Sequence, residues 1–442
     1  EQVGYIVNHA EDQYLFVDLL VFPLVEKLHS HFTTLKGVIV LCEEENLPKT
    51  DLPNVQSYES LIADESDEFE WPEFDENTAS CLCYTSGTTG NPKGVMYSHR
   101  STILHAYAGC MPDVMGLAGK DVVLPVVPMF HVNGWGIPYS TLMVGSKIVF
   151  PGPKMADGET LQSLMVDEGV TIASGVPTIW LALLDYLETS GKRIDCVKKV
   201  SVGGAACPKM IVDAFADKYN IMVHQGWGMT ETSPLGTVFN IKPTLEPIEN
   251  ADVRNLQVKQ GRGVFGIEMK ITDPDDQELP WDGKAFGALK VRGAWVCNGY
   301  FRHDSDAVDE KGWFDTGDVA IIDPHGYMQI TDRTKDVIKS GGEWISSIDL
   351  ENAAVGHPDV AEAAVIGRFH PKWTERPLLI AVIQPGSDVG RDDVLSFLDG
   401  RVAKWWLPDD VVFVEELPHT ATGKLNKVAL REQFSDYEFP SA

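Results

Sequence analysis

The sequence predicts an α/β fold with a large N-terminal domain of layered α/β subdomains and a β-rich subdomain, followed by a small C-terminal α+β domain. Short apolar runs alternate with helical patterns from residue 80 to residue 224, which is typical of layered α/β domains. Turn-forming residues and strand-like alternation replace them after about residue 253. The pattern changes again after Asp332, so we predict a boundary between domains 1–332 and 333–442.

The expected elements follow one another in a regular order. The strands predicted in the α/β part cover 80–84, 121–126, 146–150, 170–174, 199–202 and 221–224, and the helices cover 101–109, 161–167, 178–189 and 209–219. The β-rich part is expected to contain strands at 266–272 and 287–292, with turns at 273–276 and 282–283. The last domain is expected to contain helices at 347–354 and 391–402 and strands at 361–367 and 378–383.

Composition and charge restrict the partners of the protein. Hydrophobic residues make up 44% and charged residues 23% of the 442 residues, as in ordinary globular proteins. The formal net charge is −29, so the surface repels nucleic acids and anionic lipids, and we expect no nucleic-acid partner. No apolar run approaches the roughly 20 residues of a membrane-spanning helix, so no membrane span is expected.

The seven cysteines are scattered without paired spacing, which indicates reduced thiols in the cytoplasm. No basic segment followed by an apolar one opens the sequence, so no secretory signal is expected. Cys81 and Cys83 alternate on a predicted strand. Core packing is the simpler interpretation of this pair, because partner ligands for a metal or redox site are missing.

The strongest motif is a loop rich in glycines and hydroxyls at residues 84–94, between a predicted strand and a helix. Its glycines let backbone N–H groups face a ligand, its hydroxyls add donors and Lys93 adds a cation, a combination that suits a polyphosphate. The lysine is out of register with the phosphate loop of ordinary NTPases. The alternative is a flexible loop without a ligand. The candidate phosphate-binding residues are Thr85, Ser86, Gly87, Thr88, Thr89, Gly90 and Lys93.

This loop resembles the phosphate loop of the adenylate-forming (ANL) superfamily, which includes acyl-CoA synthetases, luciferases and the adenylation domains of peptide synthetases. The other motifs of that family follow in its order, and residues 227–234 and 339–346 are most similar to those of medium-chain fatty acid and methylmercaptopropionate CoA ligases. The resemblance implies a two-step acid:CoA ligase. A carboxylate and ATP give acyl-AMP and pyrophosphate, and coenzyme A then gives acyl-CoA and AMP. ATP, Mg²⁺ and coenzyme A are implied.

Two motifs after predicted strands resemble the part of the family site that holds the nucleotide. Trp227 stands where the family stacks an aromatic ring on adenine, and Thr230 stands where it contacts the α-phosphate. Glu231 stands at the Mg²⁺ position, which suits a hard carboxylate, and Thr85 is the second implied metal ligand. Without the resemblance, the small residues at 203–206 indicate only a tight turn. The implied nucleotide-binding residues here are Gly203, Gly204, Ala205, Gln225, Gly226, Trp227, Gly228, Met229 and Thr230.

Two further motifs resemble the ribose site and the hinge of the family. Asp318, in the segment WFDTGD, stands where the family's aspartate binds both ribose hydroxyls, and one carboxylate can accept both O–H groups. Arg333 would contact the nucleotide. Lys335 stands where the family's C-terminal domain swivels between the two half-reactions, so this domain is expected to be mobile. On their own, these segments would indicate a surface turn and a solvated loop.

The last motifs belong to the CoA side and to catalysis. Residues 339–346 resemble the loop beside the pantetheine arm of CoA, and residues 418–424 resemble the end motif PKTxxGK, with His419 in place of the first lysine. Lys424 is then expected to stabilise the charge that develops when the carboxylate attacks the α-phosphorus. The implied substrate- and CoA-binding residues on this side are Asp336, Lys339, Gly341, Gly342, Glu343 and Trp344.

The acid is expected to bind near the segment PMFHVNGW at 128–135. The resemblance places His131 and the aromatic Trp135 beside the acid and the CoA tunnel, although a lone histidine on an apolar loop is more often a core residue. His131 joins the candidate catalytic residues. Trp135 beside Gly203 predicts a short- or medium-chain apolar acid.

A second glycine motif, GRGVFG at 261–266, matches GxGxxG literally. A strand pattern follows it, whereas a dinucleotide fingerprint requires a helix, so a dehydrogenase is rejected. Two other functions stay open: an adenylating enzyme that delivers acyl-AMP to a carrier protein, and a non-catalytic nucleotide- or acyl-binding protein. Family members usually carry further N-terminal residues, so we expect this sequence to begin within the large domain. A homodimer is compatible with the resemblance.

Overall fold

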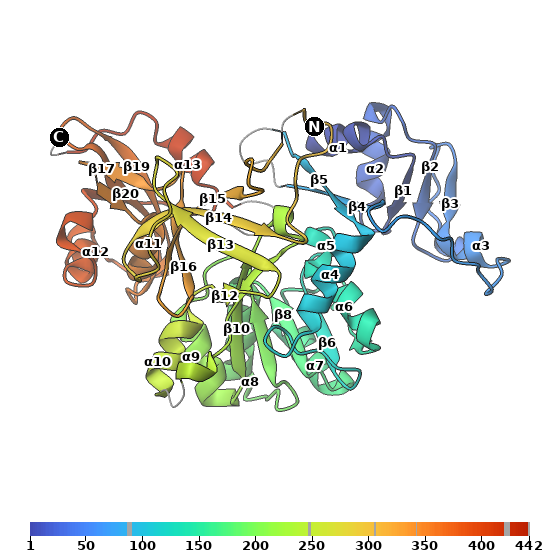
Figure 1. The fold of residues 1–442 in the computed structure, drawn as a ribbon, viewed down its shortest axis with the longest axis horizontal. Helices are drawn as coiled ribbons and strands as arrows, with labels where there is room; N and C mark the ends of the chain where they lie inside the picture. The colour runs from blue at the N-terminus through green and yellow to red at the C-terminus, as the bar shows by residue number, and fades with distance from the viewer. Residues whose placement is uncertain (86–90, 246–248, 305, 342, 420–424, 441–442) are drawn as a thin grey trace. The chain divides into compact units, whose positions relative to one another are not determined.

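The computed structural model describes residues 1–442 except 86–90, 246–248, 305, 342, 420–424 and 441–442 (Figure 1). Its contacts form two compact units. The first unit comprises Glu1–Arg100 and Tyr300–Ser305, and the second unit comprises Ser101–Gly299 and Asp306–Ala442. Each unit has its own sheets and its own core.

The first unit contains a small parallel sheet and a hairpin. Strands β1, β2 and β3 pair in parallel in that order, while β4 and β5 pair antiparallel, with Tyr84 opposite Gly94. Phe22, Val25 and Val38 form the core beside the small sheet. The elements are α1 (Gln2–Ala10), β1 (Tyr14–Val17), α2 (Phe22–Leu28), β2 (Gly37–Val40), β3 (Val55–Ser57), α3 (Tyr58–Ile62), β4 (Ala79–Tyr84) and β5 (Gly94–Ser98).

The second unit is built around a seven-stranded sheet with the order β12-β11-β10-β9-β8-β6-β7. Strands β10, β9, β8, β6 and β7 are parallel to one another. Strands β11 and β12 extend the sheet on the β10 side in antiparallel pairing. Parallel strands need long crossover connections, which helices supply here. The strands are β6 (Val122–Val126), β7 (Lys147–Ile148), β8 (Ile172–Gly175), β9 (Lys199–Val202), β10 (Met222–Gly228), β11 (Leu235–Val238) and β12 (Arg262–Gly263). The helices are α4 (His99–Cys110), α5 (Val132–Trp135), α6 (Ile137–Val144), α7 (Gly158–Glu168), α8 (Pro177–Ser190), α9 (Lys209–Tyr219) and α10 (Asn250–Gln257).

Three of these helices, α7, α8 and α9, form the main core of the unit with the sheet (Figure 1). Leu161, Trp180 and Phe215, one from each helix, are completely buried, and each such side chain contributes about 1.5–3 kcal/mol by leaving water. Asp157 caps the start of α7 by accepting a hydrogen bond from Thr160 N at 2.9 Å. The predicted helices are confirmed, with boundaries close to those expected.

A four-stranded antiparallel sheet, in the order β13-β14-β15-β16, follows in the second unit. Leu289 on β14 is completely buried, and burial alternates along this strand, so one face lies against a core. The predicted turn after the first strand is held by Asp273, whose carboxylate accepts from two backbone N–H groups. The register places Asp318 opposite Arg333. The strands are β13 (Ile267–Thr272), β14 (Phe286–Gly293), β15 (Phe314–Ile322) and β16 (Met328–Arg333).

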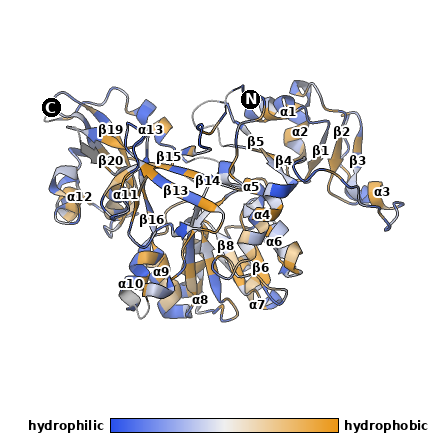
Figure 2. Ribbon diagram, in the orientation of Figure 1, coloured by the Kyte–Doolittle hydropathy of each residue, from blue (hydrophilic) through white to orange (hydrophobic). Residues whose placement is uncertain are grey.

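The last sheet has the order β18-β17-β20-β19, with β21 parallel to β20. Apolar residues of β19 and β20 (Figure 2), among them Val365 and Leu379, form its core with α11 and α12. The helix expected to reach residue 402 ends at Leu398, because Asp399 is extended and Gly400 has a φ of 78°. The elements are β17 (Ile338–Ser340), β18 (Glu343–Ile345), α11 (Ser347–Val355), β19 (Val360–His370), β20 (Thr374–Ile383), α12 (Arg391–Leu398), β21 (Asp410–Phe413) and α13 (Lys427–Gln433).

The predicted fold class is confirmed, because parallel α/β layers are followed by a β-rich sheet and by a small α+β part. The boundary between 1–332 and 333–442 falls between β16 and β17 and stays a prediction. Over the part of the chain that the structure describes, no helix combines the length and the apolar character needed to cross a membrane.

Candidate active site

The parallel strands of the seven-stranded sheet end at one edge, where two predicted motifs meet. Gly175 at the end of β8 lies opposite Val202 on β9, and Val202 lies opposite Gln225 on β10. Gly203 follows β9 directly, while Gly226 continues β10. Ligands of open α/β sheets bind beyond the carboxyl ends of such strands. The sheet therefore brings both predicted nucleotide motifs to the edge where a ligand is expected.

One buried carboxylate joins residues from three of the predicted motifs. Asp318 is 2% exposed; its Oδ2 accepts a hydrogen bond from Trp227 Nε1 at 2.8 Å, and its Oδ1 lies 2.7 Å from Arg333 Nε. Arg333 stands opposite Asp318 in the β15–β16 register. The predicted adenine, ribose and hinge residues are thus in direct contact within the second unit.

Glycines let the chain approach Trp227 closely. A Cβ at Gly236 would lie 2.4 Å from the indole Cζ3, and a Cβ at Gly228 would lie 1.9 Å from the carbonyl oxygen of Pro234. Neither position admits a side chain without rearrangement. The indole therefore lies against the backbone of β11 while its Nε1 donates to Asp318, which fixes the ring whose stacking on adenine the sequence predicts.

Glu231 lies in a short 3-10 turn directly after β10. Glu231 and the neighbouring Thr230 are buried. The segment is held through its backbone, because Cys297 N donates to Glu231 O at 2.8 Å and Trp295 Nε1 donates to Leu235 O at 2.8 Å. Burial and the charge of Glu231 raise the pKa of the Cys297 thiol to about 12. The buried carboxyl group is thus presented next to a thiol that stays protonated.

The acid-side turn, residues 132–136, has a left-handed backbone. Its residues all have φ between 45° and 70°, which costs about 1–2 kcal/mol for each residue other than glycine. Strain of this kind is concentrated at functional sites. The turn lays the indole of Trp135 on Gly203, where a Cβ would lie 3.0 Å from Cη2. The two residues that the sequence placed side by side are therefore in contact.

His131 directly precedes the acid-side turn. Its carbonyl oxygen accepts from Gly134 N at 3.1 Å, and its own N–H donates to Pro128 O at 3.0 Å. These backbone contacts fix the entry to the turn, and the residue is half-buried. His131 is therefore held at the start of the segment that carries Trp135, and its contact with the acid stays a prediction.

The phosphate-loop motif belongs to the first unit, where its two ends are joined. Thr85 N donates to Lys93 O at 2.9 Å, and Lys93 N donates to Thr85 Oγ1 at 3.0 Å. Lys93 Nζ lies 4.7 Å from the ring centroid of Tyr300. The predicted residues Ser86, Gly87, Thr88, Thr89 and Gly90 lie outside the described residues.

A buried charge network lies at the predicted hinge. Asp332 Oδ2 accepts from Ser347 N at 2.6 Å, and Lys427 Nζ lies 2.7 Å from Glu351 Oε1 and donates to Ser347 Oγ. Burial raises the pKa of Glu351. Burial opposes the charge of Lys427, but Glu351 and Asp332 raise its pKa overall. The network connects the end of β16 with α11 and α13.

The two charged residues that follow Arg333 face α13. Asp336 Oδ1 lies 2.6 Å from Arg431 Nη1. Burial is the main cause that lowers the pKa of Lys335, and Arg333 and Arg431 lower it further while Asp336 raises it. The predicted swivel residue thus lies among other cations, where its own charge is disfavoured.

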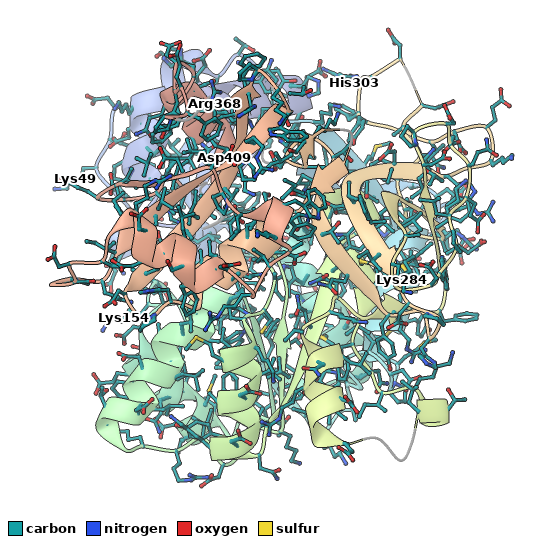
Figure 3. The ribbon with its side chains drawn as sticks, turned by 90° about the vertical axis from the view of Figure 1, so that its left-hand side faces the viewer. Lys49, Lys154, Lys284, His303, Arg368 and Asp409 are labelled. Atoms are coloured by element: carbon teal, nitrogen blue, oxygen red, sulfur yellow. The ribbon has the colours of Figure 1, made fainter. Side chains whose placement is uncertain are left out.

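The predicted CoA-side loop lies beside a cavity of the last sheet. Gly341 has a φ of 60°, and its N–H donates to Trp373 O at 2.8 Å. Lys339 N donates to Glu375 Oε2 at 2.8 Å, and Lys339 pairs with Trp344 in the β17–β18 register. Gly342 and Lys424 lie outside the described residues. The cavity measures about 640 Å³ and is lined by Ser340, Gly341, Trp373, Arg376, Trp405 and Asp409, the last of which is labelled in Figure 3.

Arg376 closes one side of this cavity with its charge already engaged. Its Nε lies 2.7 Å from Asp409 Oδ1, and its other nitrogens donate to Ser340 Oγ and to the carbonyl oxygens of Trp405 and Leu407. The guanidinium therefore holds the backbone of Trp405, a residue that is 45% exposed, at the edge of the cavity.

Gln225 has a core position that the sequence did not indicate. The residue is completely buried. With its carboxamide oriented to satisfy its neighbours, the amide nitrogen donates to Val258 O at 3.0 Å, and the oxygen accepts from Cys207 N at 3.2 Å and from Gln260 Nε2 at 2.8 Å. Its side chain thus faces the core, and its backbone forms the edge of the sheet.

Other residues around the site gave no local signal in the sequence. His105 is buried on α4, and Trp295, Trp373 and Trp405 come from three distant segments. No short motif connects them, because they reach the site only through tertiary packing.

Comparison with known proteins agrees with the motifs. Residues 1–301 match the family described as AMP-binding enzyme, and residues 349–424 match the AMP-binding enzyme C-terminal domain. A 3-methylmercaptopropionyl-CoA ligase from Ruegeria lacuscaerulensis is 50% identical over 439 residues, which cover 99% of this chain and 81% of the relative. A medium-chain-fatty-acid–CoA ligase from Ectopseudomonas oleovorans is 46% identical over 436 residues, covering 99% and 80%.

The fold also matches solved structures. The crystal structure of ATP-bound MatB from Rhodopseudomonas palustris has a TM-score of 0.81 and 26% identity, over 98% of this chain and 81% of that chain. Both family regions, the close relatives and the fold agree with the order of the motifs along the sequence. The chain belongs to the family of AMP-binding enzymes, within the adenylate-forming superfamily that its motifs resemble.

Proposed function

We propose that the protein is an AMP-forming acid:CoA ligase that acts on a short- or medium-chain carboxylic acid. The observation that carries this proposal is that Trp227 and Arg333 both contact the buried carboxylate of Asp318. An aromatic ring, a guanidinium and a carboxylate suit an adenine, a phosphate and a pair of ribose hydroxyls, respectively. This part of the site therefore fits an adenine nucleotide.

The enzyme class is that of the ATP-dependent acyl-CoA synthetases. Relatives that are 46% and 50% identical over nearly the whole chain are CoA ligases, and the family regions are those of AMP-binding enzymes. Delivery of acyl-AMP to a carrier protein is not favoured by these relatives.

In the first half-reaction, a carboxylate oxygen attacks the α-phosphorus of ATP, and the bond from this phosphorus to the pyrophosphate oxygen breaks. We assign Thr230 to the α-phosphate and, from the motif, the loop from Thr85 to Lys93 to the other phosphates. His131 is assigned to the acid. Lys424 is assigned to the charge that develops on the phosphoryl oxygens, and this assignment rests on its motif alone.

Glu231 is suited to a magnesium ion that is held together with the phosphates. Its carboxylate is a hard oxygen donor, whereas the described residues contain no group of three or more His, Cys, Asp or Glu side chains that could hold a metal. Glu231 and, from the motif, Thr85 are therefore the residues that would hold the ion. When bound, the ion neutralises charge on the triphosphate.

In the second half-reaction, the CoA sulfur attacks the acyl carbonyl carbon, and the bond to the AMP oxygen breaks. We assign this step to a second orientation of residues 333–442, reached by rotation at Arg333 to Asp336. The loop 339–344 would then lie beside the pantetheine arm. The cavity beside Gly341, with the exposed indoles of Trp373 and Trp405, offers apolar area for another part of CoA.

A matched pair of acids tests the substrate class. 3-Methylmercaptopropionate and pentanoate have the same chain length and differ by a sulfur in place of a methylene group, so comparing them separates chain length from sulfur recognition. Each acid is incubated with ATP, magnesium and free CoA, and acyl-CoA and AMP are quantified by mass spectrometry. Butanoate, hexanoate and octanoate extend the series.

The outcomes separate the alternatives. Acyl-CoA from at least one acid supports the ligase. ATP–pyrophosphate exchange without acyl-CoA for every acid would instead favour a carrier-protein acceptor. ATP binding in calorimetry without acid-dependent AMP release would favour a non-catalytic binding protein.

We also place the enzyme in a reducing compartment such as the cytoplasm, because all seven cysteines are free thiols. The resemblance is compatible with a homodimer. Light scattering after size-exclusion chromatography tests this state, and the mass of a monomer would reject it.

A further inference from the structure

His105 on α4 is a buried residue to which the reaction described above gives no role. It is 4% exposed, and burial lowers its pKa to about 4, so the imidazole is neutral at neutral pH. Its Nε2 accepts a hydrogen bond from Leu235 N at 3.2 Å. The proton of the neutral ring is therefore on Nδ1, and the orientation of the ring is tied to Leu235.

The other edge of the same ring faces the acid-side turn. A Cβ at Gly136 would lie 2.5 Å from Cε1 of His105 and 2.7 Å from its Nδ1. Only glycine fits at this close approach, and the φ of 70° at Gly136 also favours glycine. The imidazole is thus in contact with the residue that directly follows Trp135.

Helix α4 is a rigid support for this ring. Ser140 Oγ on α6 donates to Ala106 O at 3.3 Å, and a Cβ at Gly109 would lie 2.9 Å from the same hydroxyl. Helices that approach through small residues are held at short separation. The position of His105 relative to α6 is therefore fixed by the close packing of the two helices.

Leu235 closes the nucleotide-side segment, residues 229–235, which carries Glu231. His105 accepts from the N–H of Leu235, and Trp295 Nε1 donates to its carbonyl oxygen at 2.8 Å. The rings of His105 and Trp295 meet edge to face with centroids 6.0 Å apart. Both polar groups of the Leu235 backbone are thus held by packed rings, so the end of this segment is fixed on two sides.

We propose, on the basis of the function proposed above, that His105 is a positioning residue that fixes the acid-side turn relative to the nucleotide-side segment. One rigid ring touches both segments, and these carry the residues assigned to the acid and to the α-phosphate. A misplacement of about 1 Å between reacting groups can cost a hundredfold in rate. His105 therefore sets the approach of the carboxylate to the α-phosphorus without touching either substrate.

Three substitutions separate the hydrogen bond from the volume of the ring. His105→Gln can place an amide oxygen near the position of Nε2, His105→Asn places it too close to the helix, and His105→Leu removes the acceptor at similar volume. We measure ATP–pyrophosphate exchange as a function of ATP and acid, and the ratio of kcat/KM for two acids of different length. These ratios do not depend on the fraction of folded protein.

The expected result is graded. His105→Leu lowers kcat/KM for exchange about tenfold, because the N–H of Leu235 is left without its acceptor, and it changes the ratio between the two acids. His105→Gln retains wild-type ratios, and His105→Asn resembles His105→Leu. If His105→Leu does not fold, the KM values and acid ratios of His105→Gln and His105→Asn are compared instead, and a difference between these two variants supports the proposal.

His224 supplies a matched control. It is also a buried, neutral histidine, its Nδ1 donates to Phe239 O at 3.0 Å, and burial lowers its pKa to about 4, but it lies within β10. His224→Leu is expected to lower the unfolding temperature without changing the ratio between acids or the KM values.

The proposal is overturned if His105→Leu retains wild-type KM values and acid ratios below its unfolding temperature. It is also overturned if Gln and Asn behave alike, or if His224→Leu changes the ratios as much as His105→Leu. Absence of exchange and of acyl-CoA formation in the wild-type enzyme would instead contradict the proposed function. The two failures are therefore distinguishable.

Discussion

The indole nitrogen of Trp227 donates a 2.8 Å hydrogen bond to Asp318, which lies 91 residues later in the chain. The same carboxylate faces Arg333 across the β15–β16 register. The ring, the carboxylate and the guanidinium therefore hold one another in place, and preorganisation of this kind lowers the ordering cost of binding a ligand.

Asp318→Asn is expected to raise the KM for ATP about tenfold. The amide keeps the size of the side chain but loses the charge that faces Arg333 and one of the acceptor oxygens for ribose hydroxyls. Initial rates of acid-dependent AMP release against ATP concentration measure the effect. Glu268→Gln, an exposed carboxylate on the same sheet that pairs with Arg292, is the control and should leave this KM unchanged. An unchanged KM in Asp318→Asn would remove Asp318 from the nucleotide site.

Gly203→Ala is expected to shift the acid preference toward shorter chains. The new Cβ would lie 3.0 Å from Cη2 of Trp135, so the indole must move by a few tenths of an ångström into the space proposed for the acid. The ratio of kcat/KM for octanoate and butanoate measures the shift. Gly299→Ala adds the same methyl group where no atom lies within 4 Å and serves as control. A ratio equal to that of the wild type would place the acid elsewhere.

Lys424→Ala is expected to lower acyl-AMP formation by a factor of about a hundred or more, because a positioned charge is lost from the transition state. Transfer of the acyl group from supplied acyl-AMP to CoA should be largely retained. Stopped-time assays of each half-reaction make the comparison. Equal loss of both half-reactions would mean that the motif assigns this lysine to the wrong step.

Lys427→Met is expected to destabilise the protein by about 3–5 kcal/mol, because Glu351 is left as an unpaired buried carboxylate. The double substitution Lys427→Met with Glu351→Gln should recover most of this loss, since the amide can still accept from Val365 N, which donates to Glu351 at 2.7 Å. Urea unfolding of the single and double variants provides the double-mutant cycle. Equal stability of all variants would show that the pair contributes nothing.

Stability is expected to fall below about pH 6.5. His105 and His224 have pKa values lowered to about 4 in the folded protein, so the unfolded chain binds protons first as the pH falls from 6.5 to 4. Each histidine then costs about 1.4 kcal/mol per pH unit in that range. The loss between pH 6.5 and pH 4.5, measured by urea unfolding, should be smaller in His224→Gln than in the wild type. Equal losses of stability in His224→Gln and in the wild type over this pH range would contradict a neutral, buried His224.

The sequence predicts the fold class and most elements because the relevant signals are local. Apolar periodicity and turn-forming residues such as those at 273–276 are contained in short windows. The contact of Trp227 with Asp318 depends instead on strand register and on the absence of a side chain at Gly236, which no window of sequence specifies.

Gln225 illustrates why motif membership does not give the direction of a side chain. It lies two residues before Trp227, yet β10 is an interior strand between β9 and β11, with buried residues on both faces. A strand covered on both sides directs even polar side chains into packed layers. His105 was missed for the related reason that its role depends on two segments that approach it only in the folded chain.

Cys297 has a consequence for an enzyme whose second substrate is itself a thiol. Its backbone N–H donates to Glu231 O at 2.8 Å, and the residue is buried. Burial and the charge of Glu231 raise the pKa of its thiol to about 12, which keeps this sulfur a poor nucleophile. Cys297 therefore does not act as a second reactive thiol.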